Sequence, residues 1–170
     1  AIAETKKLAE KLDAPVCSGY QHNDSFPGSH PLAVGPLGYN GSKAAMELIS
    51  KADVVLALGT RLNPFSTLPG YGRDYWPKNA NIIQVDINPD RIGLTKKVTV
   101  GISGDAKLVA QQIFDRLASN AGDADRQERK DLIHQTKSAW LQKLSSLDHE
   151  EDDQGTVWNK EARERDKDRM

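Results

Sequence analysis

Several features are scarce or missing in this 170-residue sequence, and each absence narrows the possible functions. Cys17 is the only cysteine, which excludes a disulfide framework and a zinc site built from several cysteines. No apolar run approaches the length of a membrane span, and nothing resembles a secretory leader. The net charge is only −1, so neither nucleic acid nor a membrane surface is an expected partner. We therefore expect a cytoplasmic protein.

What is present is an alternation of helix-like and strand-like segments. Apolar residues recur at helical spacing, or follow a capping residue, in segments 3–12, 42–52, 88–93 and 105–118. Asn88 is the expected cap of the third segment, and the inner face of the fourth is expected to be Leu108, Val109, Ile113 and Leu117. Short apolar runs typical of strands occupy 14–20, 53–59, 81–87 and 97–102, and the second of these is expected to be covered on both faces. The proline-rich segments 21–41 and 61–81 are expected to be loops. This alternation predicts an α/β fold with a doubly wound parallel sheet.

The character of the sequence changes after this α/β region, which covers residues 1–118. Residues 119–147 are expected to form a helical connection, because Leu132, Thr136, Trp140 and Leu144 repeat about once per turn. Residues 148–170 are dense in charge and are interpreted as a linker. The chain begins within a pattern typical of a helix and ends on the charged stretch, so we expect it to be a piece of a longer polypeptide.

The stretch "GPLGYNGSKAAMEL", residues 35–48, raises the question of a phosphate-binding loop. A P-loop requires Gly-Lys-Ser/Thr directly after a strand, whereas this stretch has Ser before Lys and follows a proline-containing segment that is a poor strand candidate. The P-loop is therefore excluded. A simpler site stays open, because a helix N-terminus, here capped by Asn40 or Ser42, can hold a phosphate through its backbone N–H groups.

Other candidate residues follow the predicted strands, where ligands of open α/β sheets bind. Asp86 could accept hydrogen bonds from a ribose or could organise the turn that follows it. Asp105 is expected to cap a helix rather than to touch a ligand, and Arg61 could contact a ligand or pair with an acid. Cys17 is expected to be an inert core thiol. No metal-ligand spacing of histidines and no catalytic triad is visible, so we predict no metal site and no catalytic residue in this chain.

Four stretches, "YNGSKAA", "ALGTRL", "QVDINP" and "GDAK", resemble in order and spacing the central domain of thiamine diphosphate enzymes of the acetolactate synthase group. Further stretches, "YQHNDSFPGSHP", "RLNPFSTLPGYG", "DYWPKNA" and "SSLDHEEDDQGTVWNKEAR", are similar to a branch of acyltransferases that act on a sulfonated aldehyde. The family's central domain opens with a strand and a glycine-rich turn ahead of the first helix, and this chain begins after them.

The resemblance implies an enzyme of three α/β domains that forms a homodimer or homotetramer. Thiamine diphosphate and Mg²⁺ would be bound by the other two domains, which are the partners of this one. The implied parent reaction, a step of taurine metabolism, converts sulfoacetaldehyde and phosphate into acetyl phosphate and sulfite. This chain alone is expected to be inactive. The alternatives are a stand-alone module that binds FAD, ADP or CoA, and the central domain of an acetolactate synthase-like carboligase.

Relatives in this family bind FAD or ADP in the central domain, and the resemblance implies a cofactor-binding set in this chain. The matching residues are Leu37, Gly38, Tyr39, Asn40, Gly59, Arg61, Asp86, Ile87, Gly104 and Asp105. The flavin pattern continues with acids where this chain reads "LNPF", which favours an adenine nucleotide or a vestigial site over flavin. Gln21, His22 and Asn23 correspond to a segment near the substrate entrance and are predicted to be substrate-proximal.

Overall fold

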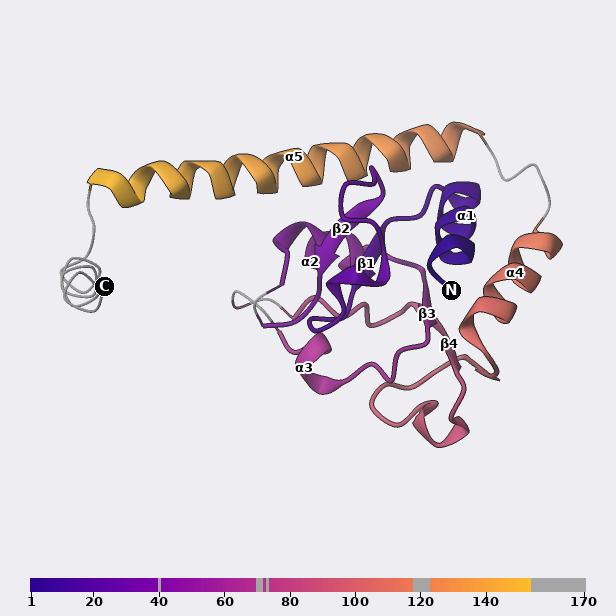
Figure 1. The fold of residues 1–170 in the computed structure, drawn as a ribbon. Coiled ribbons are helices and arrows are strands. Elements are labelled where there is room, and N and C mark those ends of the chain that lie inside the picture. The colour runs from indigo at the N-terminus through magenta and orange to yellow at the C-terminus, as the bar shows by residue number, and fades with distance from the viewer. Residues whose placement is uncertain (40, 70–71, 73, 118–122, 154–170) are drawn as a thin grey trace, which may run out of the picture. The chain divides into compact units, whose positions relative to one another are not determined.

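The computed structural model describes residues 1–39, 41–69, 72, 74–117 and 123–153, and for 123–125 and 147–153 it describes the backbone alone. Contacts divide the chain into two compact units, Ala1–Lys137 and Ser138–Met170. The first unit contains parallel strands with flanking helices, as Figure 1 shows, which confirms the predicted α/β class.

One sheet pairs β1 (Val16–Ser18) with β2 (Ala33–Pro36) in parallel. Helix α1 (Ile2–Leu12) leads into β1, a 3₁₀ turn η1 (Asn23–Ser25) follows it, and α2 (Lys43–Ser50) follows β2. The prediction of an uninterrupted loop over 21–41 is therefore wrong. Strand β2 escaped notice because its four residues end in Gly-Pro, and only its pairing with β1 makes it a strand.

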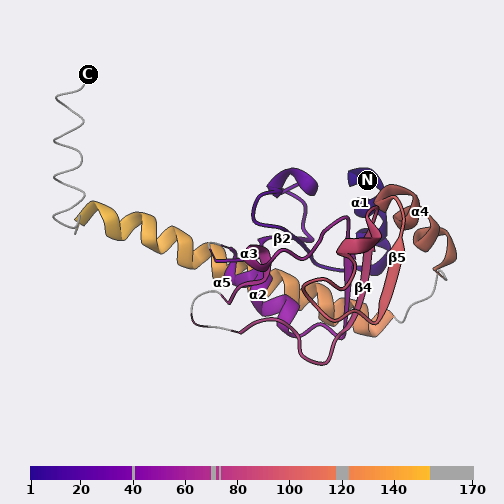
Figure 2. The ribbon, with the colours of Figure 1, turned by 90° about the horizontal axis from the view of Figure 1, so that it is seen from below.

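The other sheet has the order β3 (Val54–Leu58), β4 (Asn81–Asp86), β5 (Val100–Ser103), and both of its pairings are parallel. Helix α3 (Pro64–Thr67) lies in the segment expected to be a loop, the turn η2 (Pro89–Arg91) follows β4, and α4 (Ala106–Arg116) follows β5. Figure 2 shows β4 and β5 beside α4.

Strand β3 is less covered than its sequence predicts. Among the described residues it pairs only with β4, and the side chain of Val54 is 48% exposed. The expectation of a strand buried on both faces is therefore wrong in this structure. A continuous apolar run is typical of an interior strand, whereas β3 has a described partner on one side only.

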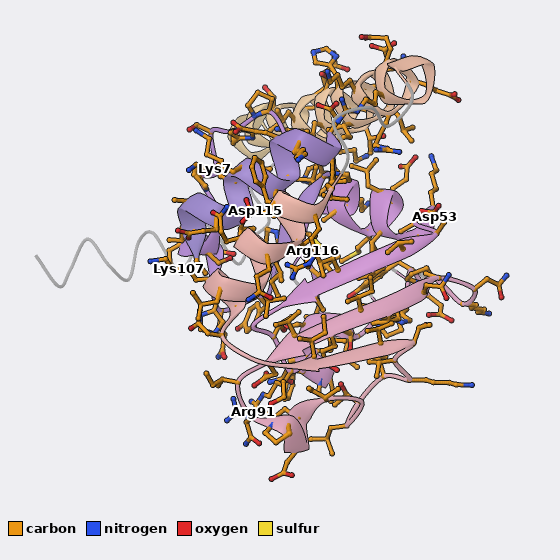
Figure 3. The ribbon with its side chains drawn as sticks, turned by 90° about the vertical axis from the view of Figure 1, so that its right-hand side faces the viewer. Lys7, Asp53, Arg91, Lys107, Asp115 and Arg116 are labelled. Atoms are coloured by element: carbon orange, nitrogen blue, oxygen red, sulfur yellow. The ribbon has the colours of Figure 1, made fainter. Side chains whose placement is uncertain are left out.

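Two helices cover the same region of the first unit, as Figure 3 shows for α1 and α4 beside the strands. At their C-terminal ends, Lys11 donates from Nζ to the carbonyl oxygen of Phe114 at 2.8 Å. At their N-terminal ends, the positive charge of Lys107 helps to lower the pKa of the partly buried Glu4, although a backbone hydrogen bond is the main cause. The two helices therefore run in the same direction. The predicted inward-facing Leu108 is exposed instead, and Ala110 is the buried residue of α4.

Helix α5 (Asp123–Asp153) is longer than the predicted connection at 119–147. Its basic residues bind the C-terminal end of α1, where carbonyl groups carry a partial negative charge. Arg126 donates to the carbonyl oxygen of Lys11, Arg129 donates to that of Leu12 at 2.7 Å, and Lys130 pairs with Asp13 at 3.3 Å. The first six residues of the predicted linker at 148–170 continue this helix, and the remainder lies outside the described residues.

Candidate functional site

Six of the candidate residues lie along one edge, where the parallel strands β3, β4 and β5 end. The backbone N–H of Gly59 donates to the carbonyl oxygen of Val85 at 2.8 Å, and that of Gly104 donates to the carbonyl oxygen of Asp86 at 3.0 Å. Ile87, Asp105 and Arg61 lie one, two and three residues after the ends of β4, β5 and β3. The sequence therefore correctly predicted that these segments meet at the carboxyl edge of a sheet.

Both acids at this edge are engaged by the chain itself. One carboxylate oxygen of the buried Asp86 accepts from the backbone N–H of Asn88 at 2.9 Å, so this residue organises the turn after β4. One oxygen of Asp105 accepts from the N–H groups of Lys107 and Leu108 at 2.9 and 3.0 Å. Asp105 is thus the N-cap of α4, as predicted, and it occupies amide groups that could otherwise bind a phosphate.

The glycines of the stretch 35–41 are required by packing within the chain. A Cβ on Gly38, whose φ is +108°, would lie 2.5 Å from the carbonyl oxygen of Phe65. One on Gly41 would lie 2.5 Å from the carbonyl oxygen of Pro36. The stretch is therefore a tight turn that carries the chain from β2 into α2.

Ser42, rather than Asn40, caps α2, because its Oγ accepts from the N–H of Ala45 at 3.3 Å. Of the candidate residues in this turn, Leu37 is buried and the side chain of Tyr39 is 71% exposed. Asn40 lies outside the described residues. The turn therefore exposes one large aromatic side chain, whereas its capping serine and its glycines serve to form the turn and the start of α2.

Sequence reasoning missed Gln84, a polar residue in the middle of an apolar strand. Its side chain is 1% exposed and fully hydrogen-bonded. The amide nitrogen donates to the carbonyl oxygens of Thr60 and Arg91 at 3.0 and 3.2 Å, and the amide oxygen accepts from the N–H of Gly93 at 2.9 Å. Gln84 therefore joins the loop after β3 to the loop after β4. The sequence did carry a signal for this role, because a single amide side chain among the apolar residues of "NIIQVDI" must find hydrogen-bond partners when it is buried.

The predicted substrate-proximal residues form the turn after β1. Gln21, His22 and Asn23 are all exposed. The backbone N–H of His22 donates to the carbonyl oxygen of Gly19 at 3.0 Å, and Ser18 Oγ contacts Asn23 Oδ1 at 3.4 Å. These bonds fix the backbone of the turn and leave the His22 imidazole accessible.

The partly buried Cys17 and the buried Tyr75 have shifted pKa values. Burial raises the pKa of the Cys17 thiol to about 11, which agrees with an inert core thiol. Burial also raises the pKa of Tyr75, whose hydroxyl donates to the carbonyl oxygen of Ser66 at 3.4 Å. Within the described residues, no group of three or more His, Cys, Asp or Glu could hold a metal ion. The described helices include none that is both long and apolar enough to cross a membrane.

A hollow of about 310 Å³ lies beside α2, away from the candidate residues. Its lining is Met46, Glu47, Ser50, Asp74 and Tyr75. Glu47 pairs with Lys51 at 3.2 Å and Asp74 with Lys78 at 3.9 Å, so its acids are balanced by neighbouring lysines. None of the residues predicted to bind a cofactor or substrate lines this hollow.

Comparison with known proteins identifies close relatives. The family described as "Thiamine pyrophosphate enzyme, central domain" matches residues 1–113. A probable sulfoacetaldehyde acetyltransferase of Rhizobium meliloti (strain 1021) is 80% identical over 170 residues, which are 100% of this chain and 29% of that protein. A sulfoacetaldehyde acetyltransferase of Roseovarius nubinhibens is 75% identical over 163 residues, which are 96% of this chain and 27% of that protein.

More distant relatives share the same region. A probable acetolactate synthase large subunit of Methanococcus aeolicus is 33% identical over 149 residues, which are 86% of this chain and 24% of that protein. An X-ray structure of a protein from Mycobacterium smegmatis, described as a thiamin diphosphate-dependent enzyme, is similar with a TM-score of 0.52 and 25% identity. That similarity covers 69% of this chain and 22% of the other. The chain thus spans less than a third of the length of each of these relatives.

Proposed function

The chain belongs to the thiamine pyrophosphate enzyme family, as a central domain, and we propose that it serves in a sulfoacetaldehyde acetyltransferase. The observation that carries this proposal is the contrast in identity between relatives. The Rhizobium meliloti sulfoacetaldehyde acetyltransferase is 80% identical over the whole chain, whereas the Methanococcus aeolicus acetolactate synthase is 33% identical over 86% of it. The contrast disfavours a carboligase, and the match to parts of much longer enzymes disfavours a stand-alone module.

The proposed reaction breaks the C–S bond of sulfoacetaldehyde and releases sulfite. An oxygen of phosphate then takes up the acetyl group, which gives acetyl phosphate. Thiamine diphosphate supplies the carbanion chemistry when bound, together with Mg²⁺. The described residues do not fit that cofactor, because they contain no cluster of metal ligands and the N-terminus of α4 is occupied by Asp105. We assign the cofactor and its metal to the other two domains of a homodimeric or homotetrameric enzyme.

Within that enzyme this chain acts as a scaffold, and its strand pairing supports this role. Among the described residues β1 pairs only with β2, and β3 pairs only with β4, so each has one edge without a described partner. The N-terminal end of α1 lies near that of α4, which starts at the carboxyl edge, and α1 then leads into β1. A crossover helix that follows a parallel strand runs in this direction. A strand ahead of α1 in the longer protein would therefore complete the domain.

The carboxyl edge is proposed to be a vestigial nucleotide site rather than a tight flavin site. The two acids of this edge, and the glycine turn after β2 of the other sheet, are engaged by the chain itself. An adenine nucleotide would have to bind through the exposed Arg61, Ile87 and Tyr39 without free amide groups at the start of α4. We expect FAD, ADP and CoA to leave the thermal stability of the chain unchanged, whereas a ligand at about 100 times its Kd adds roughly 2.7 kcal/mol.

The decisive experiment uses a hybrid in which this chain replaces the matching segment of the Rhizobium meliloti relative. We expect the purified hybrid, with thiamine diphosphate and Mg²⁺, to form sulfite and acetyl phosphate from sulfoacetaldehyde and phosphate. A hybrid that folds and binds thiamine diphosphate but forms no sulfite would contradict the proposal that this chain serves as the central domain of such an enzyme.

The substrate-proximal residues are tested in the same hybrid. His22→Ala is expected to raise the KM for phosphate or sulfoacetaldehyde, because an accessible imidazole next to Gln21 and Asn23 can donate a hydrogen bond to a sulfonate or phosphate oxygen. The matched control is His134→Ala, since His134 is also exposed but lies on α5. If both variants keep the kinetic constants of the parent, the turn after β1 has only a structural role.

A further inference from the structure

Four large apolar side chains stand exposed around the short helix α3. Tyr20 is 44% exposed, Tyr39 71%, Phe65 66% and Leu68 39%. We call these four residues the aromatic patch. Tyr20 and Tyr39 follow β1 and β2 of one sheet, and Phe65 and Leu68 follow β3 of the other, so the patch draws on segments after the strands of both sheets. Exposed apolar side chains occur singly on most proteins, but a gathered set marks an interaction site.

Close packing brings together the backbone segments that carry Tyr20, Tyr39 and Phe65. The chain at 65–66 passes between two glycines, because a Cβ on Gly38 would lie 2.5 Å from the carbonyl oxygen of Phe65 and one on Gly19 would lie 3.4 Å from Ser66 Oγ. Tyr20 and Tyr39 follow directly on those glycines. The Tyr75 hydroxyl holds α3 from within by donating to the carbonyl oxygen of Ser66. The patch is therefore supported by a tightly packed base.

The segments that carry the patch contain no charged residue, although Asp24, Lys43 and Arg61 stand directly at their ends. Segments 18–23, 36–42 and 62–69 contain no Asp, Glu, Lys or Arg, although these residues make up 28% of the chain. Aromatic enrichment together with depletion of charge is the composition of the buried centre of a protein interface. By contrast, the equally exposed Leu94 is followed within three residues by two lysines, as expected for a residue that stays in water.

We infer that the aromatic patch is a docking surface for the rest of the longer polypeptide, whose apolar side chains cover Tyr20, Tyr39, Phe65 and Leu68. The size of the relatives argues for this occupant, because the chain corresponds to only 29% of the Rhizobium meliloti protein and more than two thirds of that protein remains to be packed around it. The inference rests on the proposed function, since it takes the chain as one domain of such a protein. The patch lies next to Gln21, His22 and Asn23, so docking there would also close one side of the predicted substrate entrance.

The test is a pair of substitutions, Phe65→Asp and Leu94→Asp, made both in the 170-residue chain and in the hybrid protein. The two side chains are 66% and 68% exposed, so a charge should cost the isolated chain equally little at either position. In the hybrid, Phe65→Asp is expected to lower the thermal midpoint by several degrees and to reduce sulfite formation roughly tenfold or more, as at interface hot spots. Leu94→Asp should leave both unchanged.

Two outcomes would overturn the inference. The first is a Phe65→Asp hybrid that matches the Leu94→Asp hybrid in thermal midpoint and in activity, which would mean that the patch faces water. The second is a 170-residue chain that dimerises on size-exclusion chromatography and becomes monomeric with Phe65→Asp, which would make a second copy the occupant. Failure of the proposed function is recognised separately, because a hybrid without sulfite formation still reports docking through its thermal midpoint.

Discussion

The loops that follow β4 and β5 differ from those that follow β1, β2 and β3, although all of them lie at the carboxyl ends of parallel strands. In the former, acidic side chains are bonded within the chain: Asp86 holds a turn and Asp105 caps α4, while Gln84 joins the loop after β4 to the loop after β3. The latter present Tyr20, Tyr39, Phe65 and Leu68 outward. Contacts within the chain hold the backbone of both regions, and the second region differs in the large apolar side chains that it exposes.

This contrast shows that a match to a family motif need not mean that its residues bind a ligand, because they can serve the fold instead. "QVDINP" and "GDAK" match the family, yet in this chain their side chains serve turns and caps. "LNPF" departs from the flavin-binding pattern and supplies the exposed Phe65. Substitutions in the bonded region should therefore reduce the stability of the chain alone, and substitutions in the aromatic patch should matter only in the longer protein.

The largest effect on the isolated chain is expected for Gln84→Leu. The change removes three partly buried hydrogen bonds, to the carbonyl oxygens of Thr60 and Arg91 and from the N–H of Gly93, which should cost about 3 kcal/mol of unfolding free energy. Urea unfolding measures it, with the exposed Gln112→Leu as control. Equal stability of the two variants would show that Gln84 does not join the loops.

Gly38→Ala should follow, with a loss of about 2 kcal/mol, because alanine is strained at a φ of +108° and its Cβ would meet the carbonyl oxygen of Phe65. Gly28→Ala is the matched control, since a Cβ there meets nothing within 4 Å. Thermal unfolding of both variants gives the comparison. A Gly38→Ala chain as stable as Gly28→Ala would mean that the base of the aromatic patch is loosely packed.

Asp105→Ala should cost about 1 kcal/mol, the usual loss for removing a helix N-cap, and Asp105→Asn should retain most of the stability. The measurement is again urea unfolding. A large loss for Asp105→Asn would indicate that the negative charge, rather than the cap, stabilises α4.

The smallest effect is expected for Phe65→Ser in the 170-residue chain, which should change the unfolding free energy by less than about 0.5 kcal/mol because the ring is largely exposed. A loss of several times that amount would mean that Phe65 stabilises the chain itself. The contrast between the two regions would then disappear.

The sequence predicted much of this architecture, because apolar periodicity and capping residues are local signals. The caps at Ser42, Asn88 and Asp105 are confirmed, since each side chain can reach amide groups two or three residues ahead. Strand β2 and helix α3 were missed, because four residues carry too little periodicity and depend on tertiary partners. The predicted inner face of α4 was wrong at Leu108, because the side of a helix that faces inward depends on the elements that pack against it.

The candidate site was predicted only in part, because the sequence carries local signals but not the contacts between distant loops. Order along the chain places Gly59, Asp86 and Gly104 at one edge, and the structure confirms that these segments meet there. The aromatic patch and the role of Gln84 depend on loops that approach each other from distant positions in the sequence. Whether Arg61, Ile87 or His22 contacts a ligand stays a prediction.

The most direct test of the contrast is amide hydrogen exchange of the same peptides in the 170-residue chain and in the hybrid protein. We predict that exchange in segments 19–23, 37–42 and 64–68 slows markedly in the hybrid, while exchange in 84–93 and 104–108 stays the same, because these loops are already bonded within the chain. Equal exchange of the aromatic-patch segments in both proteins would contradict the account, as would slowing confined to the loops after β4 and β5.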